Sequence, residues 1–502
     1  MPVSSRRRPF VAVLGLALAT PFLLLTPPAS AAVKVAEPYD FDGDGFPELV
    51  VGAPQLQVGS VRDAGGITVL PGSTKGLPTK GRTITQATTA VAGDPKSDHA
   101  FGTAFASADF DHDGFADLAV GAEGGTEGGS VDPGSVTVLF GSPSGLTGAR
   151  SYVLTRPGAA EDDGFGASLV AADLDGDGWA DLAVGAPYQE GVEVPHEDFL
   201  AGGTVTVLHG SDAAFSTGRS TVLVGLTRGE RYDEAFGAAL AVGDVDGDRH
   251  PDLVVASAGL SFEDGDGHAG YVTVCPSGTS CTQIPSGHGY PGITALAVGN
   301  VTGSSRPEIV VGLPDADEDA EQGGAVWTLT LSGSGAQITA ADRELTQDTE
   351  GVPGSDEDGD AFGAALALGD LDSDGYADLV VGSPGEAVGR REGAGRVTVV
   401  HGGTKGYRTS GNKTYDQNTK RVPGTAEARD GFGGAVTLLD HDADGHLDLT
   451  VGAPGENDGA GAVTTLEGSG SSFTTKGSKT FGLHTLDYPT PDGALFGLAL
   501  GG

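Results

Sequence analysis

The chain has 502 residues, of which 85 are Gly and only 6% are aromatic, and its formal net charge is -41. Gly at this level without a G-X-Y period excludes collagen, and short β-branched runs within 38% hydrophobic residues argue against disorder. So much negative charge repels phosphate backbones, and we therefore expect no nucleic-acid partner.

The first 31 residues have the features of an export signal. Arg6–Arg8 precede an apolar stretch over 10–25, and Ala29–Ala31 offer an A-x-A cleavage site. A membrane anchor is the alternative, but Pro21 interrupts the run and a span needs about 20 continuous apolar residues. The paired arginines also resemble a twin-arginine signal. We expect residues 1–31 to be removed, and the protein to be secreted by the Sec or twin-arginine route without a membrane span.

An acidic motif recurs along the rest of the chain. A typical copy places acidic residues at alternate positions, then Gly, then an apolar run that ends in Gly-Ala-Pro or a variant of it, as in Asp40–Pro54. The copies begin at Asp40, Asp109, Asp173, Asp244, Asn300, Asp370 and Asp440. Their starts are 69, 64, 71, 56, 70 and 70 residues apart. A period of this kind indicates a repeat architecture.

Each repeat also contains short segments with the pattern of β-strands. A Phe-Gly pair stands eight residues before the first acid in five copies, for example at Phe101. After the apolar run, a Gly-rich gap leads to a segment such as 136–142, and a weaker β-prone segment such as 82–88 follows it. Alternating or β-branched runs between turn signals are strands. Four strands per unit and seven units predict an all-β fold, a seven-bladed β-propeller with one blade per repeat.

The Phe-Gly pair, the D-x-D-x-D-G loop and the Gly-Ala-Pro sequences at 52–54 and 452–454 resemble FG-GAP repeats. Such repeats build the seven-bladed propeller in the head of integrin α subunits and occur in many exported bacterial proteins. The resemblance covers residues 37–502. It implies ions on one face and partner recognition on the other, through the loops that join strands two and three and the loops that join blades.

The two ends of the repeat array are predicted to share one blade. The first acidic loop lacks a preceding Phe-Gly, whereas Phe496 and Gly497 lack a following acidic loop. We therefore expect the C-terminal strand to complete the first blade, which would be shared between residues 37–97 and 486–502 of a single domain spanning 32–502. Closing the ring in this way removes exposed strand edges.

The acidic loops have the ligand pattern of calcium sites. Oxygen ligands at positions 1, 3 and 5, Gly at 6, a backbone carbonyl at 7 and a carboxylate at 9 suit Ca²⁺, whereas Mg²⁺ requires a tighter octahedron. The alternative is that these aspartates only cap turns, but six near-complete sets in register disfavour it. We expect about six Ca²⁺ ions. The predicted ligands, including the carbonyls at position 7, are Asp40, Asp42, Asp44, Phe46 and Glu48; Asp109, Asp111, Asp113, Phe115 and Asp117; Asp173, Asp175, Asp177, Trp179 and Asp181; Asp244, Asp246, Asp248, His250 and Asp252; Asp370, Asp372, Asp374, Tyr376 and Asp378; and Asp440, Asp442, Asp444, His446 and Asp448.

Two of the seven copies depart from the pattern. The fourth carries Arg249 where Gly is expected, and Arg resists a positive φ, so a weaker site is expected there. The fifth, which contains Asn300, Thr302, Ser304 and Glu308, has lost most of its charge, and we expect no ion in it.

The two cysteines, Cys275 and Cys281, are separated by five residues that include Pro and Gly. A turn of this composition can bring the two sulfurs together. In an exported protein a local disulfide is favoured over a metal or redox pair.

No set of residues with the pattern of a catalytic site stands out. The sequence contains no H-E-x-x-H and no G-x-S-x-G motif. We therefore predict a monomeric, non-catalytic adhesion or binding module for an extracellular protein or carbohydrate ligand. The alternative is a carbohydrate-active hydrolase or lyase that uses paired carboxylates. Aromatic and Arg side chains on irregular loops are typical contact residues, although they can also pack against their own blade. The candidate ligand face consists of Tyr188, His196, Phe199, Arg231, Tyr232 and Phe262.

Overall fold

The structure, a computed structural model, describes only part of the chain. The described residues are 36–125, 132–156, 163–189, 192–193, 200–212, 214–215, 218–225, 235–258, 270–284, 292–314, 323–333, 339–486, 488 and 493–501. The predicted export signal lies outside these residues. Residues 35–502 form one compact unit.

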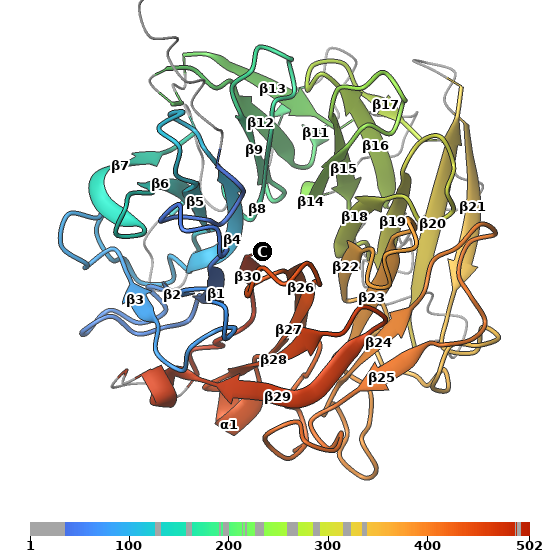
Figure 1. Ribbon diagram of the computed structural model, residues 1–502. Helices are drawn as coiled ribbons and strands as arrows, with labels where there is room; N and C mark the ends of the chain where they lie inside the picture. The colour runs from blue at the N-terminus through green and yellow to red at the C-terminus, as the bar shows by residue number, and fades with distance from the viewer. Residues whose placement is uncertain are drawn as a thin grey trace, which may run out of the picture. The chain divides into compact units, whose positions relative to one another are not determined.

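Seven antiparallel sheets of four strands follow one another along the chain, and each sheet is one blade (Figure 1). From the innermost strand outward, the first blade consists of β30 (Leu500–Gly501), β1 (Leu49–Ala53), β2 (Gly66–Leu70) and β3 (Arg82–Ile84). The second consists of β4 (Phe101–Ala108), β5 (Asp117–Ala122), β6 (Ser135–Phe140) and β7 (Thr147–Leu154). The third consists of β8 (Ser168–Ala172), β9 (Asp181–Ala186), β12 (Thr204–Leu208) and β13 (Ser220–Val224).

The remaining four blades repeat this order. The fourth consists of β14 (Phe236–Gly243), β15 (Asp252–Ser257), β16 (Tyr271–Pro276) and β17 (Thr282–Gln283). The fifth consists of β18 (Ala295–Gly299), β19 (Glu308–Leu313), β20 (Ala325–Ser332) and β21 (Thr339–Leu345). The sixth consists of β22 (Ala365–Gly369), β23 (Asp378–Ser383), β24 (Arg396–Val400) and β25 (Lys413–Tyr415). The seventh consists of β26 (Ala435–Leu439), β27 (Asp448–Ala453), β28 (Ala462–Gly468) and β29 (Phe473–Phe481).

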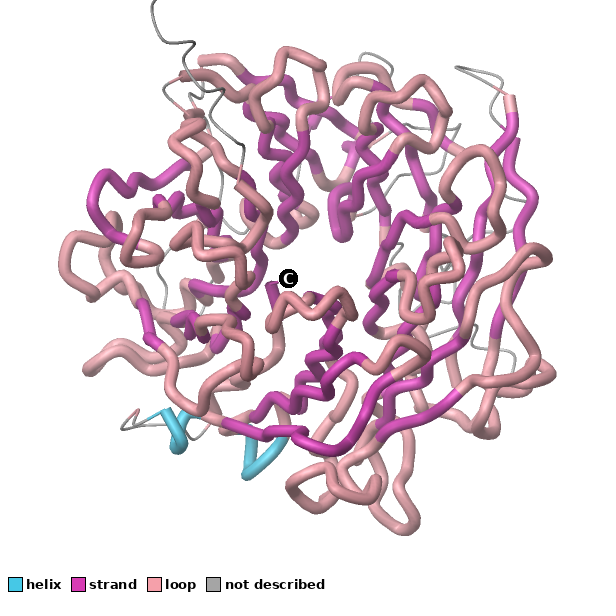
Figure 2. Tube along the Cα trace, viewed as in Figure 1, coloured by secondary structure: helices cyan, strands magenta, loops and turns pink. Residues whose placement is uncertain are grey.

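The innermost strands form a ring around a central axis. Each contacts the innermost strand of the next blade, from β4 through β8, β14, β18, β22, β26 and β30 back to β4. The predicted seven-bladed, all-β propeller is therefore confirmed. Helical structure is sparse in the described residues (Figure 2), where α1 (Glu456–Gly459) and the 3-10 turn η2 (Leu483–Leu486) are the assigned helices. No helix in the described part of the chain is long and apolar enough to cross a membrane.

The C-terminal strand completes the first blade, as predicted. Strand β30 pairs antiparallel with β1, with Val50 opposite Gly501 and Val51 opposite Leu500. The backbone N–H of Gly52 donates to the carbonyl of Ala499 at 2.9 Å, and that of Gly497 donates to the carbonyl of Gly52 at 2.9 Å. The last residues of the chain therefore pair with the first strand of the array, and the end of the chain lies near the centre of the ring in Figure 1.

Close contacts between glycines explain the recurring sequence motif. A Cβ on the Gly of each Gly-Ala-Pro sequence would lie about 2 Å from the carbonyl oxygen of the Phe-Gly glycine of the next blade, for example 2.0 Å between Gly452 and Gly497. The adjacent Phe side chains, such as Phe432 and Phe496, are fully buried between blades. Burying a side chain of this size contributes about 1.5–3 kcal/mol. The motif is thus the interface between neighbouring blades.

Two local features complete the fold. Cys275 at the end of β16 and Cys281 just before β17 form a disulfide, as predicted. The fourth strand of the first blade is shorter than the predicted 82–88 and ends at Ile84. It ends there because the Thr88 hydroxyl accepts the N–H of Thr85 at 2.9 Å, which starts a turn.

Candidate metal centres

The seven acidic loops occupy equivalent places in the seven blades. Each loop follows the innermost strand and leads into the second strand of its blade, so that position 9 is the first residue of that strand in blades two to seven. In the first blade, Glu48 immediately precedes β1. Local hydrogen bonds fold six of the seven loops alike, because the carboxylate at position 1 accepts the backbone N–H of position 6. The fifth loop has Asn300 at position 1. For the first three loops these bonds are Gly45 to Asp40, Gly114 to Asp109 and Gly178 to Asp173, at 3.0 to 3.1 Å.

Several carboxylate oxygens in the loops are buried without a hydrogen-bond partner. Asp40, Asp173 and Asp244 each use Oδ2 for the loop amide and leave Oδ1 unpartnered. Oδ1 is likewise unpartnered in Asp111 and Asp372, at position 3 of their loops. A buried acceptor without a donor is costly, and a cation would satisfy it. These oxygens therefore fit a hard divalent cation.

The carboxylates also lie close enough together to share one ion. Asp40, Asp42 and Asp44 each offer one oxygen within 4.8 Å of the others, as do Asp109, Asp111 and Asp117, and Asp173, Asp175 and Asp177. Three of the predicted carboxylate ligands in each of the first three loops are thus brought together in space. Positions 1, 3 and 9 of the second loop belong to one such group, although Asp117 lies eight positions after Asp109 in the chain.

The carboxylate at position 9 is the most buried ligand and is held by two elements. Asp117 accepts the N–H of Phe110 at 2.9 Å through Oδ2 and that of Gly141 at 2.8 Å through Oδ1. Burial, with nearby Asp111 and Asp109, raises the pKa of Asp117 to about 8. Burial likewise raises the pKa of Glu48 to about 8 and that of Asp448 to about 7. A bound cation would favour the charged forms and reverse these shifts.

The fourth and fifth loops differ in how closely they keep this conformation. Arg249 adopts a φ of 77°, close to the 86° of Gly45, and its N–H still donates to Asp244 at 3.0 Å. The fourth loop therefore keeps the backbone shape despite the strained residue. In the fifth loop, the Glu308 carboxylate accepts the N–H groups of Val301 and Thr302 as well as the Thr302 hydroxyl.

Arginines reach three of the loops from the neighbourhood of the outer strands. Arg150 contacts Asp111 at 2.6 Å, Arg408 contacts Asp372 at 2.8 Å, and Arg219 lies 3.8 Å from Asp177. Each of these guanidinium groups offsets part of the negative charge of its loop. These arginines stand at no fixed distance from the acidic motif, so the sequence pattern does not reveal them.

The residue at position 7 packs against the preceding blade's loop. The Trp179 ring stacks on His112 with ring centroids 3.8 Å apart. The Phe115 ring lies over Gly43, where an added Cβ would come within 2.9 Å of it. Sequence reasoning assigned position 7 only a carbonyl ligand and missed this contact, which joins loops more than 60 residues apart in the chain.

The predicted ligand face is only partly described. Tyr188 is 58% exposed and directly follows Pro187 after β9. His196, Phe199, Arg231, Tyr232 and Phe262 lie outside the described residues. The structure therefore does not bring this set together, and the proposed face stays a prediction.

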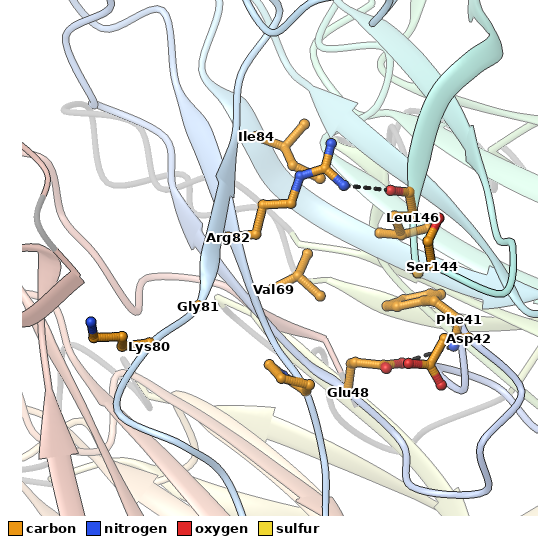
Figure 3. Close-up of a pocket in the computed structure, with 12 residues that line it drawn as sticks. Phe41, Asp42, Glu48, Val69, Lys80, Gly81, Arg82, Ile84, Ser144 and Leu146 are labelled. Atoms are coloured by element: carbon orange, nitrogen blue, oxygen red, sulfur yellow. Dashed lines mark hydrogen bonds between the residues drawn. The ribbon is translucent and has the colours of Figure 1, made fainter.

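A cavity of about 260 Å³ lies beside the first acidic loop (Figure 3). Phe41, Val69, Ile84 and Leu146 give it apolar walls, and Glu48 borders it from the loop. The guanidinium of Arg82 spans the gap between the first and second blades and donates to the carbonyl of Leu146 at 2.8 Å. No sequence pattern reveals this cavity, because its walls come from segments that are not neighbours in the chain.

A Ser-His-Asp arrangement occurs in the second repeat. His99 Nδ1 lies 2.5 Å from Asp132 Oδ2, and His99 Nε2 lies 3.2 Å from Ser135 Oγ. Burial raises the pKa of Asp132, but the hydrogen bond with His99, the electrostatic attraction of His99 and Lys96, and the N–H of Gly134 together outweigh burial, so that this pKa is lowered overall. The exposed fractions are 4% for Ser135, 1% for His99 and 3% for Asp132. A nucleophile must reach its substrate, so in this conformation the three residues tie β6 to the segment that precedes β4.

Comparison with known families agrees with the geometry. The FG-GAP repeat model matches residues 38–70, 101–139, 165–208, 236–275, 362–400 and 432–466. This chain is an FG-GAP repeat protein. The six matches fall on six of the seven blades and omit the fifth, whose acidic loop has lost most of its charge.

The curated relatives of this FG-GAP repeat protein are larger proteins. It is 33% identical over 154 residues to the phosphatidylinositol-glycan-specific phospholipase D of Rattus norvegicus, over 30% of this chain and 18% of that protein. The human phospholipase of the same name is 27% identical over 368 residues, over 69% and 42%. Integrin alpha-PS5 of Drosophila melanogaster is 35% identical over 161 residues, over 30% and 14%. The chain thus spans less than half the length of these relatives.

The integrin match confirms that this FG-GAP repeat protein resembles the propellers of integrin α subunits. Among solved structures, a mutant of AofleA from Arthrobotrys oligospora aligns with a TM-score of 0.38 and 11% identity, over 78% of this chain and 93% of that one.

Proposed function

We propose that this FG-GAP repeat protein is secreted, binds about six Ca²⁺ ions in its acidic loops, and acts as a non-catalytic adhesion or binding module. The observation that carries the calcium proposal is the set of buried carboxylate oxygens without hydrogen-bond partners, represented by Asp40, Asp173 and Asp244. Oxygen-only ligands around a Gly turn suit this ion. In this proposal, residues 1–31 direct export.

Calcium would act on the junctions between blades as well as within each loop. The N–H of Ala116 donates to the carbonyl of Asp40 at 3.1 Å, and the N–H of Ser142 donates to that of Phe41 at 3.0 Å. An ion that fixes the first loop therefore also fixes the acceptors on which the second blade depends. A ligand that binds only the folded form stabilises by mass action, by about 2.7 kcal/mol per site at 100 times its Kd.

Thermal unfolding with and without Ca²⁺ tests this proposal. The melting temperature is expected to fall clearly in excess EDTA and to be restored by millimolar Ca²⁺ but not by the same concentration of Mg²⁺. Equilibrium dialysis should then count about six ions. The variant Glu308→Gln, in the fifth loop that has lost most of its charge, serves as the control and should leave that count of ions unchanged. A transition that does not move in EDTA would refute the calcium sites.

A binding role is proposed for the surface that carries Tyr188. An exposed aromatic ring near irregular loops is a typical contact residue. A glycan array combined with a pull-down from the surrounding matrix would identify the ligand as carbohydrate or protein. The triple variant Tyr188→Ala, Phe199→Ala and Tyr232→Ala should then lose binding while its melting temperature in Ca²⁺ stays unchanged. Full retention of binding would exclude this face.

A second candidate function is hydrolysis, and the observation that favours it is the Ser135, His99 and Asp132 arrangement. Two of the relatives are named as phospholipases, whereas the integrin is not named as an enzyme. The wild-type protein and the variant Ser135→Ala can be assayed on panels of glycosides and esters. We expect neither protein to show turnover. Turnover by the wild type that Ser135→Ala abolishes would establish the hydrolase instead.

A further inference from the structure

Two of the acidic loops have a histidine among their carboxylates. His209 directly follows β12 and lies in one group with Asp175 and Asp181 of the third loop. His401 directly follows β24 and lies in the corresponding group with Asp372 and Asp378 of the sixth loop. In each group, one atom from every side chain lies within 4.8 Å of the others.

Each histidine directs a nitrogen without a hydrogen-bond partner toward its carboxylates. His401 is 4% exposed, and its Nδ1 lies 3.0 Å from Asp378 Oδ2 without the alignment of a hydrogen bond. Asp372 bonds Arg408 through Oδ2, which leaves its Oδ1 unpartnered in the same group. A buried nitrogen and a buried oxygen therefore both lack a hydrogen-bond partner within one small cluster.

The third loop adds a contact that orients its imidazole. His209 Nε2 lies 3.1 Å from Thr221 Oγ1 on β13, while Nδ1 lies 3.5 Å from both Asp175 Oδ2 and Asp181 Oδ1. When Nε2 carries the proton and donates it to Thr221, Nδ1 presents a lone pair to the two carboxylates. Metal-ligating histidines are commonly held in this way by a hydrogen bond from their other ring nitrogen.

Other blades lack a nitrogen ligand at the corresponding position. Pro71 follows β2, Phe140 ends β6, Pro276 ends β16, and Glu467 lies within β28. Carboxylate and carbonyl oxygens suit calcium, whereas imidazole favours zinc and other transition metals. The seven-fold architecture thus presents two chemically different kinds of loop in one chain.

We propose that the third and sixth acidic loops are transition-metal sites in which His209 and His401 supply a nitrogen ligand beside the carboxylates, and that they prefer Zn²⁺ to Ca²⁺. This inference rests on the proposed function and refines it: without zinc all six loops bind Ca²⁺, and when zinc is present these two loops exchange Ca²⁺ for Zn²⁺. Asp175 and Asp181 complete the site of His209, and Asp372 and Asp378 that of His401. The competing interpretation is that each histidine is only a positive counter-charge for its carboxylates.

Zinc binding in the presence of calcium tests this inference. Metal-free protein is titrated with Zn²⁺ in millimolar Ca²⁺, and the bound zinc is counted after dialysis. We expect His209→Phe and His401→Phe each to remove one tightly bound zinc and the double variant to remove two. Phenylalanine is the natural residue at this place in the second blade. The variant His484→Phe, in exposed η2, is the control and should lose none.

A second variant and a spectroscopic measurement show whether the histidine variants lose zinc because a ligand is missing or because the fold is disturbed. Thr221→Val keeps every ligand and should weaken zinc binding at the third loop by about 10-fold or more, because it removes the hydrogen bond that orients the imidazole of His209. The visible spectrum of Co²⁺-loaded wild-type protein should change in both histidine variants. Unchanged zinc counts and Co²⁺ spectra in both variants would overturn the inference.

The outcome is distinguishable from failure of the calcium proposal. Loss of zinc in the histidine variants, in a protein whose metal-free form does not melt at a higher temperature when Ca²⁺ is added, would keep the two transition-metal sites and reject calcium. If the melting temperature depends on Ca²⁺ and Ca²⁺ displaces zinc from every loop, the calcium proposal stands and the two transition-metal sites are rejected.

Discussion

Buried carboxyl groups lie at both ends of the innermost strands. Beyond the acidic loops, Asp360 precedes β22 and is 3% exposed. Burial and the neighbouring Glu386 raise the pKa of Asp360 to about 7. Glu386 is itself bonded by Gln347 and Arg396, each at 2.6 Å. Because this pKa lies above its ordinary value of 3.8, protonated Asp360 stabilises the fold at low pH, and that contribution is lost as the pH rises through about 7.

The variant Asp360→Asn should reduce this pH dependence. An amide resembles the protonated acid and still offers an oxygen to the N–H of Glu357, which donates to Asp360 at 3.1 Å. Relative to wild type in saturating Ca²⁺, we expect no gain in melting temperature at pH 4 and a gain on the order of 1–2 °C at pH 8. Thermal unfolding across this range measures the difference. The variant Asp94→Asn, at an exposed position, is the control. Equal changes in melting temperature for both variants would show that burial of Asp360 is not the cause.

A single strained residue distinguishes the fourth acidic loop. Arg249 occupies a left-handed conformation with φ of 77°, which costs a residue with a side chain about 1–2 kcal/mol. Arg249→Gly should therefore raise the free energy of unfolding by about 1 kcal/mol and tighten calcium binding at this loop, because less strain opposes the bound conformation. Chemical denaturation and calcium titration measure the two effects. Weaker calcium binding in the variant would show that the Arg side chain itself assists the site.

Neighbouring blades contact each other through close-packed backbone atoms. The Gly that precedes the third strand meets the backbone of the Phe-Gly pair of the next blade. A Cβ on Gly395 would lie 2.2 Å from the Phe432 carbonyl oxygen, and one on Gly461 would lie 2.2 Å from that of Phe496. These contacts leave no space for a side chain, and they hold neighbouring sheets together through backbone atoms.

The pair of variants Gly395→Ala and Gly389→Ala separates this contact from backbone strain. Both glycines have positive φ, of 85° and 73°, but nothing lies within 4 Å of a Cβ on Gly389. We expect Gly389→Ala to cost about 1 kcal/mol and Gly395→Ala on the order of 3 kcal/mol, since the second also forces backbone atoms apart. Denaturant unfolding of both variants measures the difference. Similar losses would mean that the interface adjusts freely.

At the scale of the whole molecule, strand pairing and a hydrogen bond between loops close the ring. Strand β30 completes the first blade, and the seventh acidic loop contacts the first blade through the carbonyl of His441, which accepts the N–H of Ser73 at 3.0 Å. Burial lowers the pKa of His441 to about 4, so this imidazole stays neutral. Its Nδ1 lies 3.1 Å from the carbonyl of Pro47. The junction between the chain ends therefore resembles the junctions inside the array.

Deletion of residues 494–502 should destabilise the ring beyond its first blade. The deletion removes β30 and buried Phe496, so β1 loses its inner partner and the seventh blade loses its neighbour. We expect a lower melting temperature and earlier proteolysis throughout the propeller. The variant Phe496→Ala should cost about 3–5 kcal/mol while keeping the strand. A truncated protein that melts like the full-length one would contradict closure by the C-terminal segment.

The sequence alone predicted much of the fold because each repeat carries its own strand, turn and loop signals within a short stretch of chain. Strand, turn and acidic loop recur within each repeat, and the orphan Phe496 at one end matched the missing pair at the other. Seven blades, their shared first blade and the Cys275–Cys281 pair follow from such patterns. The loop ligands follow as candidates for the same reason, since alternate carboxylates and a Gly turn lie within nine residues.

Contacts between segments that are distant in the chain, within a blade or between blades, were decided only by the tertiary structure. His209 and Thr221 meet the third loop from outer strands, Trp179 stacks on His112 of the preceding blade, and Ser135 lies beside His99 across 36 residues. No short-range periodicity encodes these pairs, because they depend on how each blade twists and packs against the next. The repeat period therefore determines where a loop can hold a cation, and the packing of neighbouring strands and blades determines what surrounds it.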